Sequence, residues 1–164
     1  MGIRTEYFAA PTDEVAATAL RTPGGPADPD QRTDLPRFDA VAVPSMDPFV
    51  MLGGLAGALS GRPYGEVTAH PRHGTLVCSG GDEGPWIVTV SQTLADDLAS
   101  AAPARLARVA REWHATATPA VPPRELAAAL LPLAALAARA ADQGYGLYCW
   151  TSLTDDERRM TSRE

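Results

Sequence analysis

The chain has 164 residues, of which 45% are hydrophobic and 21% charged, a balance that suits one globular domain with a core of its own. Its formal net charge is −6, and the excess of acid lies in the first 100 residues, which hold 13 acidic and 6 basic side chains. Nucleic-acid binding needs an excess of cations on one face, so this charge argues against a general nucleic-acid-binding protein.

Two features argue against a membrane or secreted protein. The longest apolar run, residues 126–138, has 13 residues, whereas a bilayer span needs about 20. The first residues carry charge where a secretory signal needs an apolar core. Without that signal, Cys78 and Cys149 are expected to be reduced thiols, and we expect a cytoplasmic protein without a disulfide.

The first part of the chain predicts a strand, a helix and a loop. Residues 3–8 alternate β-branched and aromatic side chains with charged ones, which is typical of a strand. Thr12 is a helix N-cap followed by two acids, and the helix should end near residue 21. Residues 22–36 are rich in proline and glycine, and we expect them to form a mobile surface loop.

A second strand and a second helix follow. Residues 38–43 are mostly apolar, which indicates an inner strand. The helix should run from Pro48 to Ser60 and stop at Gly61, with its apolar stripe at Phe49, Leu52, Leu55, Ala56 and Leu59. The glycines inside this helix weaken it, so we expect another element to pack closely there.

The remaining elements predict an α+β fold. We expect a hairpin at 75–78 and 86–90, followed by helices from Ser91 and from Pro103. A long helix should begin at Pro123, kink at Pro132 and end at Gly144, and a last strand should follow at 147–153. The sequence thus predicts one domain over residues 1–153, with a mixed, mostly antiparallel sheet covered mainly on one side by about five helices. Residues 154–164 should form a polar tail.

Several segments carry a family resemblance. They are Met1-Gly2-Ile3 before the first strand, Met46-Asp47-Pro48 at a helix start, Ser60-Gly61 at its end, and Arg139 to Gly144 before the last strand. In this order of elements the chain resembles the YfbM-like family of small bacterial proteins of unknown function. The segment Leu147-Tyr148-Cys149-Trp150 is similar to endings common in actinobacterial proteins. The resemblance implies an α+β fold and no agreed catalytic residues.

One cluster contains side chains that can bind metal. His70 and His73 are three residues apart and Cys78 follows five residues later, so they offer three of the nitrogen and sulfur ligands that zinc prefers. The spacing matches no established zinc motif, and histidines in loops are usually solvated. The alternative hypothesis is a ligand pocket in the 70–78 segment, with Arg62 or Arg72 holding an anion.

A second cluster is basic. Arg105, Arg108 and Arg111 recur every third residue beside Trp113 and predict a slanting basic stripe on one helix, which suits an acidic partner or a carboxylate. An ordinary solvated helix face is the competing interpretation. Acidic residues in two loops are the other expected partner contacts: Asp28, Asp30, Asp34, Asp82 and Glu83.

Neither cluster forms a recognised catalytic motif. The chain contains no Gly-x-Ser-x-Gly elbow and no Gly-x-Gly-x-x-Gly turn, and Asp96 and Asp97 are neighbours that point apart on a helix. We therefore expect a non-enzymatic cytoplasmic module that binds another protein, of the immunity or accessory-factor type, without a cofactor. One alternative is a small-molecule enzyme or ligand-binding protein with a pocket near His70 to Cys78. Another is a homo-oligomeric subunit.

Overall fold

The computed structural model describes residues 3–21, 25–26, 38–43, 50–81, 84–117 and 122–153. Their helices and strands occur in this order: β1 (Ile3–Ala10), α1 (Asp13–Ala17), the 3-10 helix η1 (Thr18–Arg21), β2 (Ala40–Val43), α2 (Val50–Ser60), α3 (Tyr64–Thr68), β3 (Leu76–Ser79), β4 (Trp86–Thr89), α4 (Gln92–Ser100), α5 (Pro103–Ala117), α6 (Pro123–Gln143) and β5 (Gly146–Leu153).

The five strands form one sheet in the order β2-β1-β5-β4-β3. All four neighbouring pairs are antiparallel, so the expected α+β class is confirmed, and the sheet has no parallel pair among the described strands. The last strand of the chain lies in the centre of the sheet, where it pairs with β1 along eight residues, from Ile3 opposite Leu153 to Ala10 opposite Gly146. The first and the last strand of the described chain thus lie side by side in the sheet.

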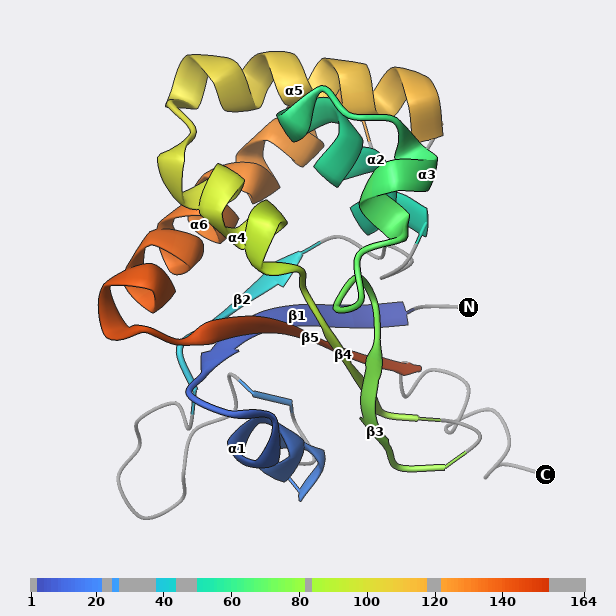
Figure 1. Cartoon of the computed structure of the whole chain (residues 1–164), viewed down its shortest axis with the longest axis vertical. Coiled ribbons are helices and arrows are strands. Elements are labelled where there is room, and N and C mark those ends of the chain that lie inside the picture. The colour runs from blue at the N-terminus through green and yellow to red at the C-terminus, as the bar shows by residue number, and fades with distance from the viewer. Residues whose placement is uncertain are drawn as a thin grey trace, which may run out of the picture.

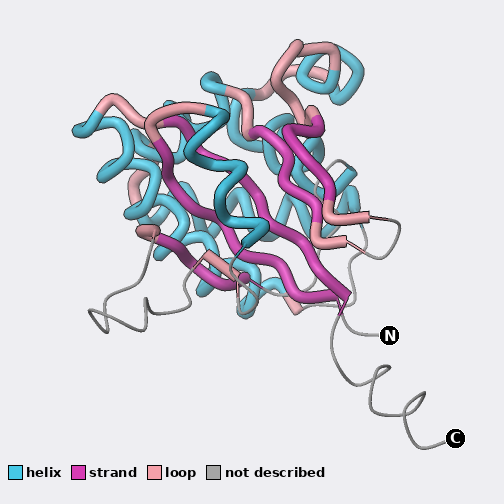
Figure 2. Tube along the Cα trace, turned by 90° about the horizontal axis from the view of Figure 1, so that it is seen from below, coloured by secondary structure: helices cyan, strands magenta, loops and turns pink. Residues whose placement is uncertain are grey.

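Alternation along the strands gives the sheet two apolar faces of unequal size. Tyr7 and Ala9 belong to the larger core, beneath helices α2 to α6, whereas Phe8 and Ala10 belong to the smaller core beside α1. Figure 1 shows α2 to α6 above the sheet and α1 below it, and Figure 2 shows α1 lying across the strands. The prediction of helices mainly on one side is confirmed.

Helix α6 is the central helix of the larger layer, because it packs on the strands as well as on α4 and α5. The predicted apolar stripes are buried at Leu52, Leu55, Ala56 and Leu59 of α2, Leu106, Val109, Ala110 and Trp113 of α5, and Leu126, Leu130, Leu133, Ala137 and Ala140 of α6. Phe49 and the predicted helix start at Pro48 lie outside the described residues. Pro132 lies within α6 without ending it, and Gly144 ends the helix with a left-handed φ of 69°. Helix α5 packs on α6 and α2 at the end of the molecule away from the sheet.

The sequence analysis missed α3. Its five residues, from Tyr64 to Thr68, are too few to produce a periodic apolar stripe, and none of them is buried. The helix nevertheless explains a glycine of α2, because a Cβ at Gly53 would lie 2.7 Å from the Tyr64 ring and 2.8 Å from the Thr68 methyl group. The expected close packing at this glycine is therefore confirmed.

Two segments with sequence-based predictions lie largely outside the described residues. Of the predicted loop 22–36 only Gly25 and Pro26 are described, and both are buried, with Gly25 directly above the Glu6 carboxylate. Residues 154–164 are not described at all. Across the described ranges, no helix combines the length and hydropathy needed to cross a bilayer.

Candidate functional site

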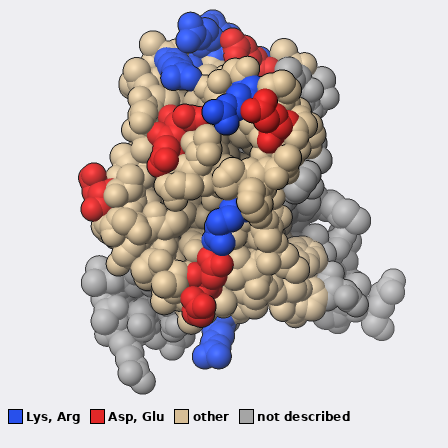
Figure 3. Space-filling model, viewed as in Figure 1, with Lys and Arg blue, Asp and Glu red and all other residues tan. Residues whose placement is uncertain are grey.

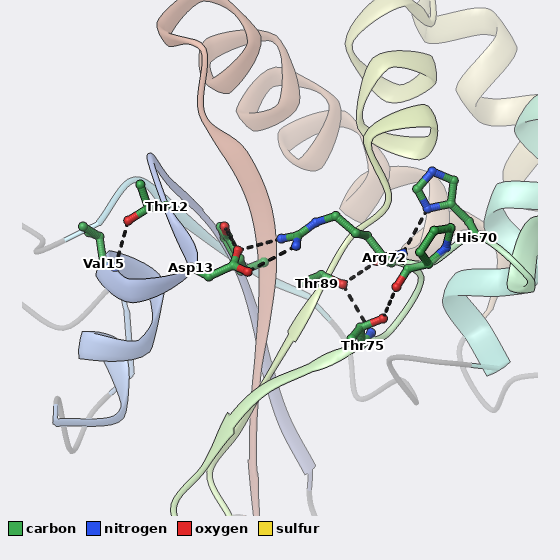
Figure 4. Close-up of polar contacts among 9 residues, drawn as sticks. Thr12, Asp13, Val15, His70, Arg72, Thr75 and Thr89 are labelled. Atoms are coloured by element: carbon green, nitrogen blue, oxygen red, sulfur yellow. Dashed lines mark hydrogen bonds and ion pairs between the residues drawn. The ribbon is translucent and has the colours of Figure 1, made fainter.

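The most connected polar group lies on the α1 side of the sheet (Figure 4). Arg72 donates two hydrogen bonds to the Asp13 carboxylate, Nη2 to Oδ1 at 2.6 Å and Nη1 to Oδ2 at 3.2 Å. The Tyr148 hydroxyl donates to the same Oδ1 at 2.6 Å. The Thr89 hydroxyl donates to the Arg72 carbonyl. The Asp13 carboxylate thus joins helix α1 to the 70–75 turn and to β5, and Thr89 ties the turn to β4 through the Arg72 backbone.

These contacts change the proton affinities of the group. The Arg72 hydrogen bonds, and after them the Tyr148 hydroxyl, hold the pKa of Asp13 below its usual value. Burial, and after it the hydrogen bond to the Asp13 carboxylate, raises the pKa of Tyr148 to about 12. Tyr148 is therefore a neutral hydrogen-bond donor near pH 7, and the group acts as a tie between elements rather than as an acid–base pair.

The proposed metal ligands are not brought together. His70 Nδ1 accepts a hydrogen bond from the Arg72 backbone N–H at 3.1 Å, His73 is buried, and burial raises the pKa of the half-buried Cys78 thiol. Among the described residues, no three His, Cys, Asp or Glu side chains gather into a group that could hold a metal ion. The turn at Gly74, where φ is +58°, separates the histidines from strand β3.

The two arginines proposed for an anion also differ in position. Arg72 extends toward Asp13 and away from the His70 ring (Figure 4). Arg62 lines a pocket with His70, Glu66 and Asp97 between α2, α3 and α4. This pocket has a volume of about 40 Å³, room for a few water molecules, whereas ligand sites for small molecules usually measure about 300–1,000 Å³.

The basic stripe lies on the exposed side of α5, and the structure divides it. The Arg105 guanidinium donates to the Leu59 carbonyl in the last turn of α2. Arg105 and Arg108 line one groove of about 380 Å³ between α5 and the end of α2, and Arg111 is not part of its lining. Figure 3 shows basic side chains grouped at the upper end of the molecule, where α5 lies.

The arginines near the sheet have a different environment. Arg4, Arg72 and Arg139 each form an ion pair, with Glu6, Asp13 and Asp39 respectively. Within the described ranges neither Arg108 nor Arg111 has an ion pair or hydrogen bond. The acidic residues expected to contact a partner, Asp28, Asp30, Asp34, Asp82 and Glu83, lie outside the described residues.

Sequence reasoning missed the ion pairs of this fold. Asp13 and Arg72 are 59 residues apart, Asp39 and Arg139 are 100 apart, and Tyr148 is 135 residues from Asp13. Pairs at such separations leave no local pattern, and only alignment of homologues can show them from sequence. Comparison of the chain with family models, with curated proteins and with solved structures gave no match.

Proposed function

We propose that this chain is a non-enzymatic module that binds another protein in the cytoplasm, as an immunity or accessory factor does. Its docking surface is the exposed side of α5, defined here by Arg105, Arg108 and Arg111 and called the arginine face. The partner presents an acidic surface to it. Complementary charge of this kind speeds association and selects the partner.

One observation carries the proposal: none of the three arginines of the arginine face forms an ion pair within the described residues, although the chain is acidic and Glu112 lies on the same helix. Arg72 and Arg139, by contrast, each form an ion pair with a carboxylate of the chain itself. Three like charges on a single helix side repel one another, which costs some stability. An acidic partner would relieve that repulsion.

The residues with nucleophilic or acid–base potential support a role without catalysis. The pKa values of Tyr148 and Cys78 are both raised, so the two side chains stay protonated near neutral pH. Cys149, the other thiol, is buried in the larger core. Both cysteines are free thiols, which agrees with a reducing cytoplasm.

The charge of the arginine face also favours a different protein over a second copy. In a two-fold symmetric dimer the same patch meets itself. Two arginine faces would then place guanidinium groups opposite each other, which is unfavourable. The expected complex is therefore heteromeric across α5.

The test compares capture by variants that differ only in where a charge is reversed. Tagged wild-type protein and the Arg108→Glu, Arg111→Glu and Arg21→Glu variants are incubated with extract of the native cells, and bound proteins are quantified by mass spectrometry. Arg21 is the control, because it is exposed in η1 on the opposite side of the sheet and has no ion pair in the described structure.

The proposal predicts a stoichiometric partner with an acidic surface, retained by Arg21→Glu and reduced about tenfold or more by both α5 variants. Increasing salt should release it, because exposed charges are screened. A partner retained equally by all variants, or a partner lost equally by all, would overturn the assignment of the arginine face. If the captured material contained bound metal or a small molecule and no partner protein, the proposal of a protein-binding module would be wrong.

A further inference from the structure

The groove between α5 and the end of α2 contains two residues of the arginine face. Arg105 is anchored there by a hydrogen bond, and Arg108 is not. Its walls are Ala58 to Gly61 on α2 and Arg105, Arg108, Val109 and Glu112 on α5. The groove measures about 380 Å³, which is enough for an acidic side chain and the backbone that carries it.

Arg105 is held in place before any ligand arrives. Its Nη2 donates to the Leu59 carbonyl, one of the carbonyl groups that the end of α2 leaves without a helical partner. A guanidinium has five N–H donors, so other donors remain for the groove. Anchoring also removes part of the side-chain entropy that an arginine loses on binding.

Arg108 follows three residues later, which places its side chain next to that of Arg105 on a helix. It lines the same groove and is exposed. Two neighbouring guanidinium groups repel each other unless an anion lies between them, and a carboxylate fits their planar donor pairs.

The rest of the groove limits the charge of the anion. Glu112 belongs to the groove lining, and the end of α2 contributes the partial negative charge of a helix C-terminus. Both features repel anions, and they repel the dense charge of a phosphate chain more strongly than the single charge of one carboxylate. Nucleic acid is therefore disfavoured at this groove.

We propose that Arg105 and Arg108 form a clamp for one carboxylate side chain of an acidic segment on the partner protein. This inference rests on the proposed function, and it divides the arginine face into two parts. The clamp selects the partner by donor geometry, and Arg111, outside the groove, contributes charge alone. Lysine can replace Arg111 in this arrangement but cannot replace Arg108.

The experiment uses a short blocked peptide of alternating Glu and Ala as the probe, with the Gln analogue as control. NMR of the arginine Nε–Hε groups follows the titration of the full chain. We expect saturable shifts for Arg105 and Arg108 and none for Arg21 or Arg72. Arg108→Lys should weaken binding about tenfold, and Arg111→Lys should leave it within about twofold.

Three results would overturn the clamp. The first is an equal effect of Arg108→Lys and Arg111→Lys, since charge alone would then explain binding. The second is an equal shift of all exposed arginines, and the third is tighter binding of an oligothymidine than of the Glu peptide. If the peptide bound at Arg108 but no partner protein was captured, the clamp would be supported and the proposed function would be wrong. If capture depended on Arg111 alone, the proposed function would be supported and the clamp would be wrong.

Discussion

The arginines of the sheet region and those of α5 share a side chain but not an environment. Arg72 and Arg139 each reach a carboxylate from a distant part of the chain in a two-bond arrangement. Arg108 and Arg111 lie on one exposed helix side with no such partner in the described structure. Arginines whose carboxylate partner belongs to the chain therefore connect parts of the fold. Arginines without such a partner in the described structure are available to bind another protein.

The ion pairs of the sheet region contribute modestly to stability. Asp13 and Arg72 retain 44% and 45% of their side-chain exposure, so solvent screens their attraction. Exposed pairs of this kind usually stabilise a fold by about 1 kcal/mol or less. Their main effect is to hold α1 and the 70–75 turn together across the strands. The following predictions test this division, beginning with the largest effect.

The largest expected difference in stability is between an inner and an outer residue of α5. Trp113 lies on the inner side of the helix and is 1% exposed, so Trp113→Ala should lower the free energy of unfolding by about 3–5 kcal/mol. Arg111→Ala, on the outer side, should change it by less than about 0.5 kcal/mol. Urea unfolding measures both values. A comparable decrease in the free energy of unfolding of the two variants would mean that the arginine face stabilises the fold.

The second prediction concerns Tyr148 at alkaline pH. Its pKa is about 12 in the folded chain, against about 10 for an unfolded tyrosine. The unfolded chain therefore loses this proton first, and the free energy of unfolding should fall as pH rises from about 10 to about 12. Two pKa units correspond to at most about 3 kcal/mol.

Tyr148→Phe should remove this fall, whereas Tyr64→Phe, on exposed α3, should retain it. Denaturant unfolding at a series of alkaline pH values provides the measurement. An unchanged pH dependence in Tyr148→Phe would show that ionisation of Tyr148 does not cause the fall.

The third prediction concerns Asp13 at acidic pH. The hydrogen bonds from Arg72 lower its folded-state pKa below the unfolded value of about 3.9, so the ionised carboxylate stabilises the fold above that pH. Asp13→Asn should cost about 1 kcal/mol near neutral pH, and the cost should disappear as pH falls through the folded pKa.

Glu14→Gln is the matched control, because Glu14 is the next residue of α1 and makes none of the bonds described for Asp13. Its stability should follow wild type from neutral to acidic pH. A cost in Asp13→Asn that persists at low pH would show that shape rather than charge explains the loss.

The smallest effect separates the two arginines of the clamp. Arg105→Ala removes the donor to the Leu59 carbonyl and should cost about 0.5–1 kcal/mol, while Arg108→Ala should cost nothing measurable. Hydrogen exchange of the Gly61 amide, which donates to Gly57 in the last turn of α2, should quicken only in Arg105→Ala. Equal exchange in both variants would argue that Arg105 is not anchored.

Much of the fold follows from local patterns in the sequence. The apolar spacing of Leu126, Leu130 and Leu133 predicts α6, and the capping groups at Thr12 and Ser91 mark helix starts that the structure confirms. Helix α3 and the register of each strand pair depend on packing over long sequence distances. The class of the fold was therefore predictable, while its complete strand order was not.

The candidate site shows the same limit. Spacing placed Arg105, Arg108 and Arg111 on one helix side, but the groove that includes only two of them is created by the end of α2, more than 40 residues earlier. His70, His73 and Cys78 are close in sequence, yet a turn separates them. Sequence proximity made these three residues candidate metal ligands, and the described structure does not bring them together as a metal-binding group.

The most direct test of the division between the two kinds of arginine measures one pair of variants in two ways. Arg72→Ala and Arg108→Ala are compared for their free energy of unfolding and for their affinity for the captured partner. The account predicts that Arg72→Ala is less stable and binds as wild type does, whereas Arg108→Ala is as stable as wild type and binds about tenfold or more weakly. Loss of affinity in Arg72→Ala, with full affinity in Arg108→Ala, would contradict it.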